Sequence, residues 1–165
     1  MTVVSARKDT EKLTLEFVAE FDASEERVWQ VWEDPRQLER WWGPPTYPAT
    51  FERYEFVPGG DVRYFMTGPD GSTPRGWWKI TDVQAPTRLE FDDGFAGDDG
   101  EPSGFLGVSH CVVTLEGTGG GTRMTLVSSF ESLEQLEEMT KMGMEEGMRD
   151  AMGQIDAILA EQNVR

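Results

Sequence analysis

The order of secondary-structure signals in the first 60 residues constrains the fold of this chain most strongly. Residues 13–21 alternate between apolar and polar side chains, and this period of two predicts a half-buried β-strand. Ser24 can cap a first helix, and the Asp-Pro pair at 34–35 begins a second one, because proline is tolerated at the first helical position. WWGP at 41–44 ends that helix, and PGG at 58–60 marks a turn. The sequence therefore predicts a strand, two short helices and then a long antiparallel sheet.

The rest of the chain carries strand and turn signals followed by a helical region. Turns containing Gly and Pro separate strand candidates at residues 50–57, 61–68, 75–84, 87–95, 107–117 and 121–130. Residues 92–104 hold five acidic residues and four glycines, which predicts a mobile surface loop. Ser132 and Gln135 form a capping box, so we expect one helix over about residues 132–160.

Eight short motifs follow one another along most of the chain. They are RVW at 27–29, DP at 34–35, WWGP at 41–44, PGG at 58–60, TGPDG at 67–71, PTRLEF at 86–91, GGGTRMTL at 119–126 and GMEEGM at 143–148. Together, over about residues 12–160, they resemble the START-like (SRPBCC) superfamily, in the branch related to the C-terminal domain of the activator of the heat-shock-protein-90 ATPase. The resemblance implies less about function than about fold, since the superfamily includes lipid carriers, polyketide cyclases and co-chaperones.

The fold that this resemblance implies is an α+β helix-grip fold. In it, a curved antiparallel sheet wraps around a long C-terminal helix, with two short helices after the first strand, and a cavity remains between sheet and helix. A chain of 165 residues fits one such domain. We expect about seven strands, a flexible tail at residues 1–10, and a single START-like ligand-binding domain over residues 11–162.

Charge and composition exclude several classes of partner. With 15 Lys and Arg against 31 Asp and Glu, the net charge is −16, which repels phosphate backbones, so nucleic acid is not expected as a partner. No apolar run reaches the roughly 18 residues that span a bilayer, and we expect no membrane insertion. The single cysteine, Cys111, precludes an internal disulfide, and the N-terminus lacks the pattern of a signal peptide. These features favour a cytoplasmic protein.

Large apolar side chains on one face of the sheet and one face of the helix predict a binding cavity. On the helix, Met144 and Met148 lie four residues apart, and methionine adapts to ligands of varied shape. Gly143 and Gly147 suggest room beside the helix backbone. The candidate ligand-binding residues are Trp42, Tyr54, Phe56, Tyr64, Met66, Trp78, Phe91, Cys111, Met144 and Met148. Such a lining suits a hydrophobic small molecule with one or two hydrogen-bonding groups.

The assignment of inward faces depends on strand register. Adjacent residues on a strand point to opposite faces, so only one of Trp77 and Trp78 can face the cavity. A slip of one residue at a bulge would replace Trp78 by Trp77 and Cys111 by His110 on the inner face. At the mouth of the cavity, we expect Trp42 to line the pocket and Trp41 to belong to the core.

Catalytic and metal-binding motifs are nearly absent from the sequence. His110 and Cys111 are the only histidine and cysteine, and as strand neighbours they point apart, so they cannot form a catalytic pair. They also cannot supply a transition-metal site, and nothing in the sequence implies a cofactor. We therefore assign no catalytic residue and no metal ligand.

Three functions are compatible with these sequence features. The first is the binding of a hydrophobic small molecule, with no assigned catalysis. The second is a chaperone-associated module that uses the acidic surface and an outward tryptophan to bind a protein partner. The third is an enzyme of the cyclase or hydratase type that uses acids of the cavity or His110 as a base. A homodimer is also expected, through the outward member of Trp77 and Trp78 or through Phe95.

Overall fold

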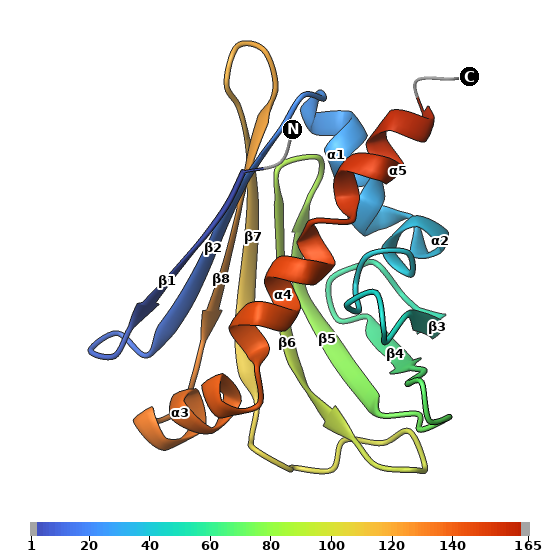
Figure 1. Ribbon diagram of the computed structural model, residues 1–165, viewed down its shortest axis with the longest axis vertical. Coiled ribbons are helices and arrows are strands. Elements are labelled where there is room, and N and C mark those ends of the chain that lie inside the picture. The colour runs from blue at the N-terminus through green and yellow to red at the C-terminus, as the bar shows by residue number, and fades with distance from the viewer. Residues whose placement is uncertain (1–2, 163–165) are drawn as a thin grey trace.

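One curved antiparallel sheet of eight strands dominates the computed structural model, which describes residues 3–162 (Figure 1). The strands lie in the order β1-β2-β8-β7-β6-β5-β4-β3, and each neighbouring pair is antiparallel. Their bounds are β1 (Val3–Asp9), β2 (Thr14–Phe21), β3 (Ala49–Tyr54), β4 (Asp61–Met66), β5 (Arg75–Gln84), β6 (Arg88–Ala96), β7 (Ser109–Gly117) and β8 (Thr122–Ser129).

The sequence predicts a flexible tail at residues 1–10, but residues 3–9 form the strand β1, so the prediction is wrong there. Residues 1 and 2 lie outside the described part of the chain. All of β1 pairs with β2, from Val3 opposite Glu20 to Asp9 opposite Thr14. Without β1, β2 would be an edge strand with a row of unpaired backbone groups, and the added strand satisfies them. It also raises the strand count from the expected seven to eight. The sequence of β1 has no clear alternation of apolar and polar residues, which is why periodicity did not reveal it.

Two short helices follow β2, as the sequence predicts. They are α1 (Glu25–Glu33) and α2 (Pro35–Leu38). Ser24 Oγ accepts a hydrogen bond of 3.2 Å from the backbone N–H of Arg27, and Asp34 Oδ1 accepts one of 2.9 Å from that of Arg36. These caps satisfy backbone donors that each helix leaves unpaired in its first turn.

The C-terminal helical segment crosses the concave face of the sheet, but it is divided into three helices (Figure 1). These are α3 (Leu133–Lys141), α4 (Met144–Met152) and α5 (Ile155–Gln162). Gly143 separates α3 from α4 with a φ of +85°, a left-handed conformation that ends a helix and favours glycine. The α+β helix-grip fold is confirmed, whereas the expected uninterrupted helix over 132–160 is corrected.

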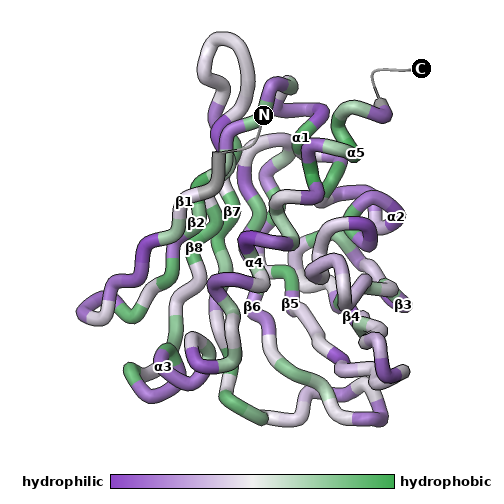
Figure 2. The backbone as a smooth tube through the Cα atoms, in the orientation of Figure 1, coloured by the Kyte–Doolittle hydropathy of each residue, from purple (hydrophilic) through white to green (hydrophobic). Residues whose placement is uncertain are grey.

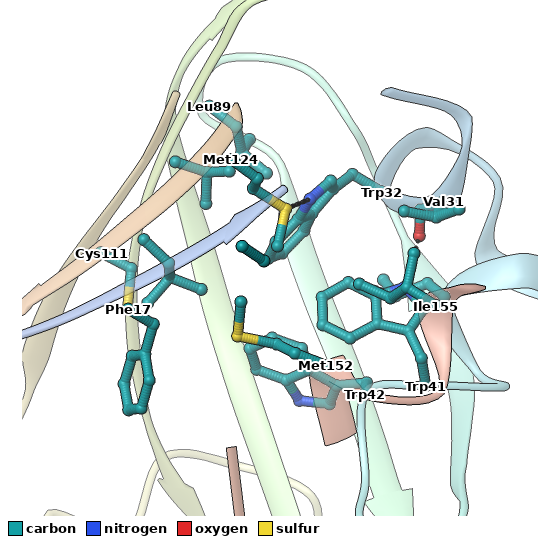
Figure 3. Packing of buried hydrophobic residues seen from close by; sticks show 14 of the residues in the cluster. Phe17, Val31, Trp32, Trp41, Trp42, Leu89, Cys111, Met124, Met152 and Ile155 are labelled. Carbon is teal, nitrogen blue, oxygen red and sulfur yellow. Dashed lines mark hydrogen bonds between the residues drawn. The ribbon is translucent and has the colours of Figure 1, made fainter. Parts of the chain in front are cut away.

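Large aromatic side chains fill the concave side of the sheet near α1 and α2. Trp32 Nε1 donates to Met124 Sδ at 3.3 Å, and Trp41 Nε1 donates to the carbonyl oxygen of Val31 at 2.9 Å (Figure 3). Figure 2 shows hydrophobic residues along the middle strands of the sheet and along α5, whereas α2 is largely hydrophilic. A buried cluster therefore joins the helices to the sheet at this end of the molecule.

The register that was expected for the middle strands is the observed one. Trp78 and Cys111 are buried on the concave side, and their neighbours Trp77 and His110 are only half-buried. The ring of Trp77 packs beside Gly94 of the adjacent strand. None of the helices in residues 3–162 is long and apolar enough to cross a bilayer.

Two glycines near the start of α4 give opposite predictions. Gly143→Ala should lower the free energy of unfolding by about 1–2 kcal/mol, because a side chain disfavours the left-handed backbone. Gly147 lies within α4, and a Cβ there would meet no atom within 4 Å, so Gly147→Ala should raise that free energy by about 0.5–1 kcal/mol. Urea denaturation measures both. Changes of the same sign would contradict the assigned helix break.

Candidate functional site

A pocket of about 300 Å³ lies between the helical segment and the half of the sheet formed by β4 to β7. Four methionines and two glycines of residues 139–148 form one wall. The opposite wall comes from the sheet and from the chain after α2. The full lining is Trp42, Pro44, Tyr64, Met66, Asp93, Gly94, Phe95, Ser109, Met139, Met142, Gly143, Met144, Gly147 and Met148.

Half of the ligand-binding residues predicted from the sequence line this pocket. They are Trp42, Tyr64, Met66, Met144 and Met148. Trp42 lies at the pocket while Trp41 is completely buried, which is the arrangement expected for this pair. Gly143 and Gly147 also line the pocket, so the space predicted beside the helix backbone is part of it.

The other five predicted residues lie behind the pocket or beside it. Trp78 and Phe91 are stacked with ring centroids 4.1 Å apart, and both are fully buried. Tyr54 stacks on Phe56, and its hydroxyl donates to the carbonyl oxygen of Trp32. Cys111 is also buried and does not line the pocket. Strand alternation assigned their inward face correctly, but tryptophans from α1 and the following loop fill that part of the concave side.

Asp93 is a pocket-lining side chain that the sequence did not predict as a site residue. It lies on β6 between Phe91 and Phe95, on the same face of the strand, and it lines the pocket. Ser109 Oγ on β7 donates a hydrogen bond to Asp93 Oδ1, and Cys111 Sγ lies 3.8 Å from Asp93 Oδ2. The sequence Asp-Asp-Gly at 92–94 indicated a loop, but β6 continues to Ala96. Alternation along β6 was the signal that would have identified Asp93.

Burial controls the protonation of this carboxyl group. Removal from water raises the pKa of Asp93 to about 6, although the hydrogen bonds from Ser109 and Cys111 act in the opposite direction. None of the described residues that line the pocket is Lys, Arg or His, so no cation of the lining neutralises the carboxylate. Burial also raises the pKa of the Cys111 thiol, which keeps it protonated.

Aromatic residues provide the other polar atoms near the pocket. Tyr64 stacks on Phe51 at 5.0 Å, and its ring edge meets Trp42 at 6.3 Å. Burial raises the pKa of the Tyr64 hydroxyl, so this group stays protonated. The buried indole N–H of Trp42 has no hydrogen-bond partner among the described residues. The pocket thus combines an apolar wall with a few polar groups.

His110 lies outside the pocket, on the outer side of the sheet. Its Nδ1 is 2.7 Å from Asp92 Oδ1, and its Nε2 is 3.1 Å from Glu90 Oε1. Burial lowers the pKa of His110, but the hydrogen bonds to Asp92 and Glu90 outweigh this effect and raise it. A histidine with both nitrogens engaged by carboxylates favours the charged form, which cannot act as a base. The geometry therefore gives no support to His110 as a base for a ligand in this pocket.

A metal site finds no support in the arrangement of side chains. Within residues 3–162, no group of three or more His, Cys, Asp and Glu side chains is placed to hold a metal ion. Asp92 and Asp93, which are neighbours in the sequence, are directed to opposite sides of the sheet by strand alternation.

The fold and this site define a helix-grip protein with a pocket between its sheet and its C-terminal helical segment. A family model described as "Activator of Hsp90 ATPase homolog 1-like protein" matches residues 22–160. The chain belongs to this family, and the resemblance to START-like proteins is confirmed. The comparison with curated proteins found no match.

Solved structures of bacterial proteins share this fold. A solution structure from Arthrobacter aurescens is 61% identical, with a TM-score of 0.93, and the match covers 97% of this chain and 93% of that one. A crystal structure from Mycobacterium smegmatis is 46% identical, with a TM-score of 0.88 and coverage of 96% and 97%. A crystal structure from Rhodobacter sphaeroides is 23% identical, with a TM-score of 0.82 and coverage of 98% and 99%, and it supports the fold alone.

The half-buried carboxyl group of Asp93 predicts a pH dependence of stability. Because the pKa of Asp93 is raised to about 6, its carboxyl group favours the folded state below its unfolded pKa of 3.8, and this advantage is lost as the pH rises through 6. Relative to Asp93→Asn, the wild type should therefore lose up to roughly 3 kcal/mol of unfolding free energy between about pH 4 and pH 7. Urea denaturation across this range measures the difference.

A loop aspartate supplies the matched control for this experiment. Asp98 is exposed, and Asp98→Asn changes the charge by the same amount, so this variant separates the loss of one negative charge from the loss of the carboxyl group in the pocket. Parallel pH profiles for the wild type and Asp93→Asn would show that Asp93 titrates as an ordinary surface carboxyl.

Proposed function

We propose that the protein binds a hydrophobic small molecule in the pocket between α4 and the sheet, and we assign it no catalytic activity. The observation that carries this proposal is the pocket itself, whose volume of about 300 Å³ lies at the lower end of the range of small-molecule sites. Its wall is mainly methionine and aromatic, and a few polar groups are present to orient a ligand.

The methionine wall suits ligands of varied shape. Met139, Met142, Met144 and Met148 are flexible and polarizable, and they contribute apolar surface without a fixed outline. Gly147 leaves open space beside this wall, since a Cβ there would meet no atom within 4 Å. These features support a carrier or sensor of an apolar molecule more than an enzyme that must hold one substrate in one orientation.

A chaperone-associated interaction module is the second candidate. It rests on the family, which is described by its likeness to the activator of the Hsp90 ATPase, and on the net charge of −16. A module that acts only through its surface does not need an apolar pocket between the sheet and the helices, so we rank this function second. The cytoplasmic location remains a prediction under both functions.

A bulky side chain in the methionine wall tests ligand binding. The neutral apolar dye Nile red should bind the wild type with increased fluorescence, because the pocket removes it from water. Met148→Trp should weaken that binding by about tenfold or more, because the indole occupies the cavity. Fluorescence titration measures the affinity, and denaturation confirms that the variant folds.

The control places a tryptophan on the same helical segment but outside the pocket. Leu133 at the start of α3 is 45% exposed, and Leu133→Trp should bind the dye as the wild type does. Equal dye binding by Met148→Trp and the wild type would contradict the proposed site.

We also propose a homodimer, held by an apolar patch. Phe95 lies 5.6 Å from Phe105 between ring centroids, and Phe105 is 58% exposed. Two subunits that each carry −16 repel one another, so added salt should tighten an apolar dimer. Sedimentation should show a larger dimer fraction at an ionic strength of about 0.15 M than at low ionic strength. A monomer at both would refute the dimer.

A further inference from the structure

We infer that the pocket selects hydrophobic amines, which bind with the ammonium group on the carboxylate of Asp93 and the hydrocarbon against the methionine wall. This inference rests on the proposed function and names the chemical class of its ligand. Its geometric basis is a single carboxylate at the side of a largely apolar pocket whose described lining contains no cation. An ammonium group is the complement that both pairs with the charge and donates hydrogen bonds to it.

The two hydrogen-bond partners of Asp93 are neutral, and His110 acts on its charge only from the outer side of the sheet. Ser109 donates a hydrogen bond to one carboxylate oxygen, and the weak Cys111 thiol lies near the other. A hydroxyl and a thiol are neutral, so they stabilise the carboxylate only in part. A carboxylate that is partly removed from water is costly without an opposite charge, and a bound ammonium group would relieve that cost.

Other features around the pocket also favour a cation. The rings of Trp42 and Tyr64 line it, and aromatic faces attract cations. The net charge of −16 draws cations toward the protein and repels anions. The positive end of the α4 dipole would act against a cation, but Glu145 and Glu146 in the first turn of α4 offset it.

Competing ligand classes satisfy the site less well. A carboxylic acid would place a second negative charge beside Asp93, which costs binding free energy. An alcohol can donate one hydrogen bond to the carboxylate, but it leaves the charge without a counterion. The same hydrocarbon chain with three head groups therefore separates the possibilities.

Displacement of Nile red by octylamine, octanol and octanoate tests this selectivity. At about pH 7.5, the wild type should bind octylamine about 10- to 100-fold more tightly than octanol, and octanoate most weakly, as expected for a charge-assisted hydrogen bond. Asp93→Asn should still bind Nile red and octanol but lose the preference for octylamine. Asp92→Asn removes the same charge from the outer side of β6 and should retain the preference.

The pH provides a test that needs no variant. Octylamine stays protonated across the range used, so its affinity should follow the ionisation of Asp93, whose pKa burial raises to about 6. The other ionisable groups near Asp93 are Asp92 and His110 on the outer side, Cys111 on β7 and Tyr64 on β4, while the helical wall contributes only Met and Gly. Octylamine should bind about tenfold more weakly at about pH 5 than at about pH 7.5. The affinity for octanol should be the same at both pH values.

The outcomes distinguish failure of this inference from failure of the proposed function. If Nile red and all three ligands fail to bind, the pocket is not a binding site. If the dye binds but octanol or octanoate matches octylamine, or if Asp93→Asn keeps the amine preference, the selectivity for amines is overturned while the binding function stands.

Discussion

The packing of Trp32 against the concave face of the sheet is the interaction on which the rest of the structure depends. Its ring centroid lies 4.7 Å from that of Trp41 and 5.8 Å from that of Trp42, and its indole N–H reaches Met124 on β8 (Figure 3). These contacts join α1, the loop after α2 and the sheet into one buried cluster. Arg27 extends the link to the C-terminal end, because its guanidinium donates to the carbonyl oxygen of Ile158 on α5 at 3.0 Å.

The pocket exists because the aromatic cluster fills only part of the concave side. Toward α3, the helical segment covers the sheet with flexible methionines and with glycines that lack side chains. Trp42 lies between the aromatic cluster and the pocket, since its ring centroid is 4.9 Å from that of Trp78 and its side chain also lines the pocket. The half with the buried aromatic cluster thus positions α4 and α5, and the other half leaves space for a ligand.

Much of the fold could be predicted from the sequence because most of its strands and helices are marked by local sequence patterns. Alternation, helix caps and turn residues located both short helices and every strand except β1. Alternation also placed Trp78 and Cys111 on the inner face of the sheet. The break of the C-terminal helix at Gly143 was less visible, since glycine within a helical pattern is tolerated at a modest cost. The strand β1 is defined by pairing with β2 and not by its own pattern.

The site was harder to predict because its limits depend on how distant segments fill space. Alternation gives the face of a side chain, but it cannot say whether a tryptophan from another segment covers that face, as happens at Trp78 and Phe91. Asp93 was missed for a different reason. It lies where the strand candidate over residues 87–95 overlaps the loop predicted over residues 92–104, and the pairing of β6 with β5 and β7 places it in the strand.

The central claim is that an apolar molecule occupies the space between α4 and the sheet, and an NMR titration tests it most directly. Backbone amide shifts of the protein would be followed while octanol, a neutral apolar ligand, is added. We expect saturable changes at Gly94, Gly143 and Gly147, which line the pocket, and none at Gly119 and Gly120 in the distant turn between β7 and β8. Unchanged pocket glycines, or changes spread evenly over both groups, would contradict it.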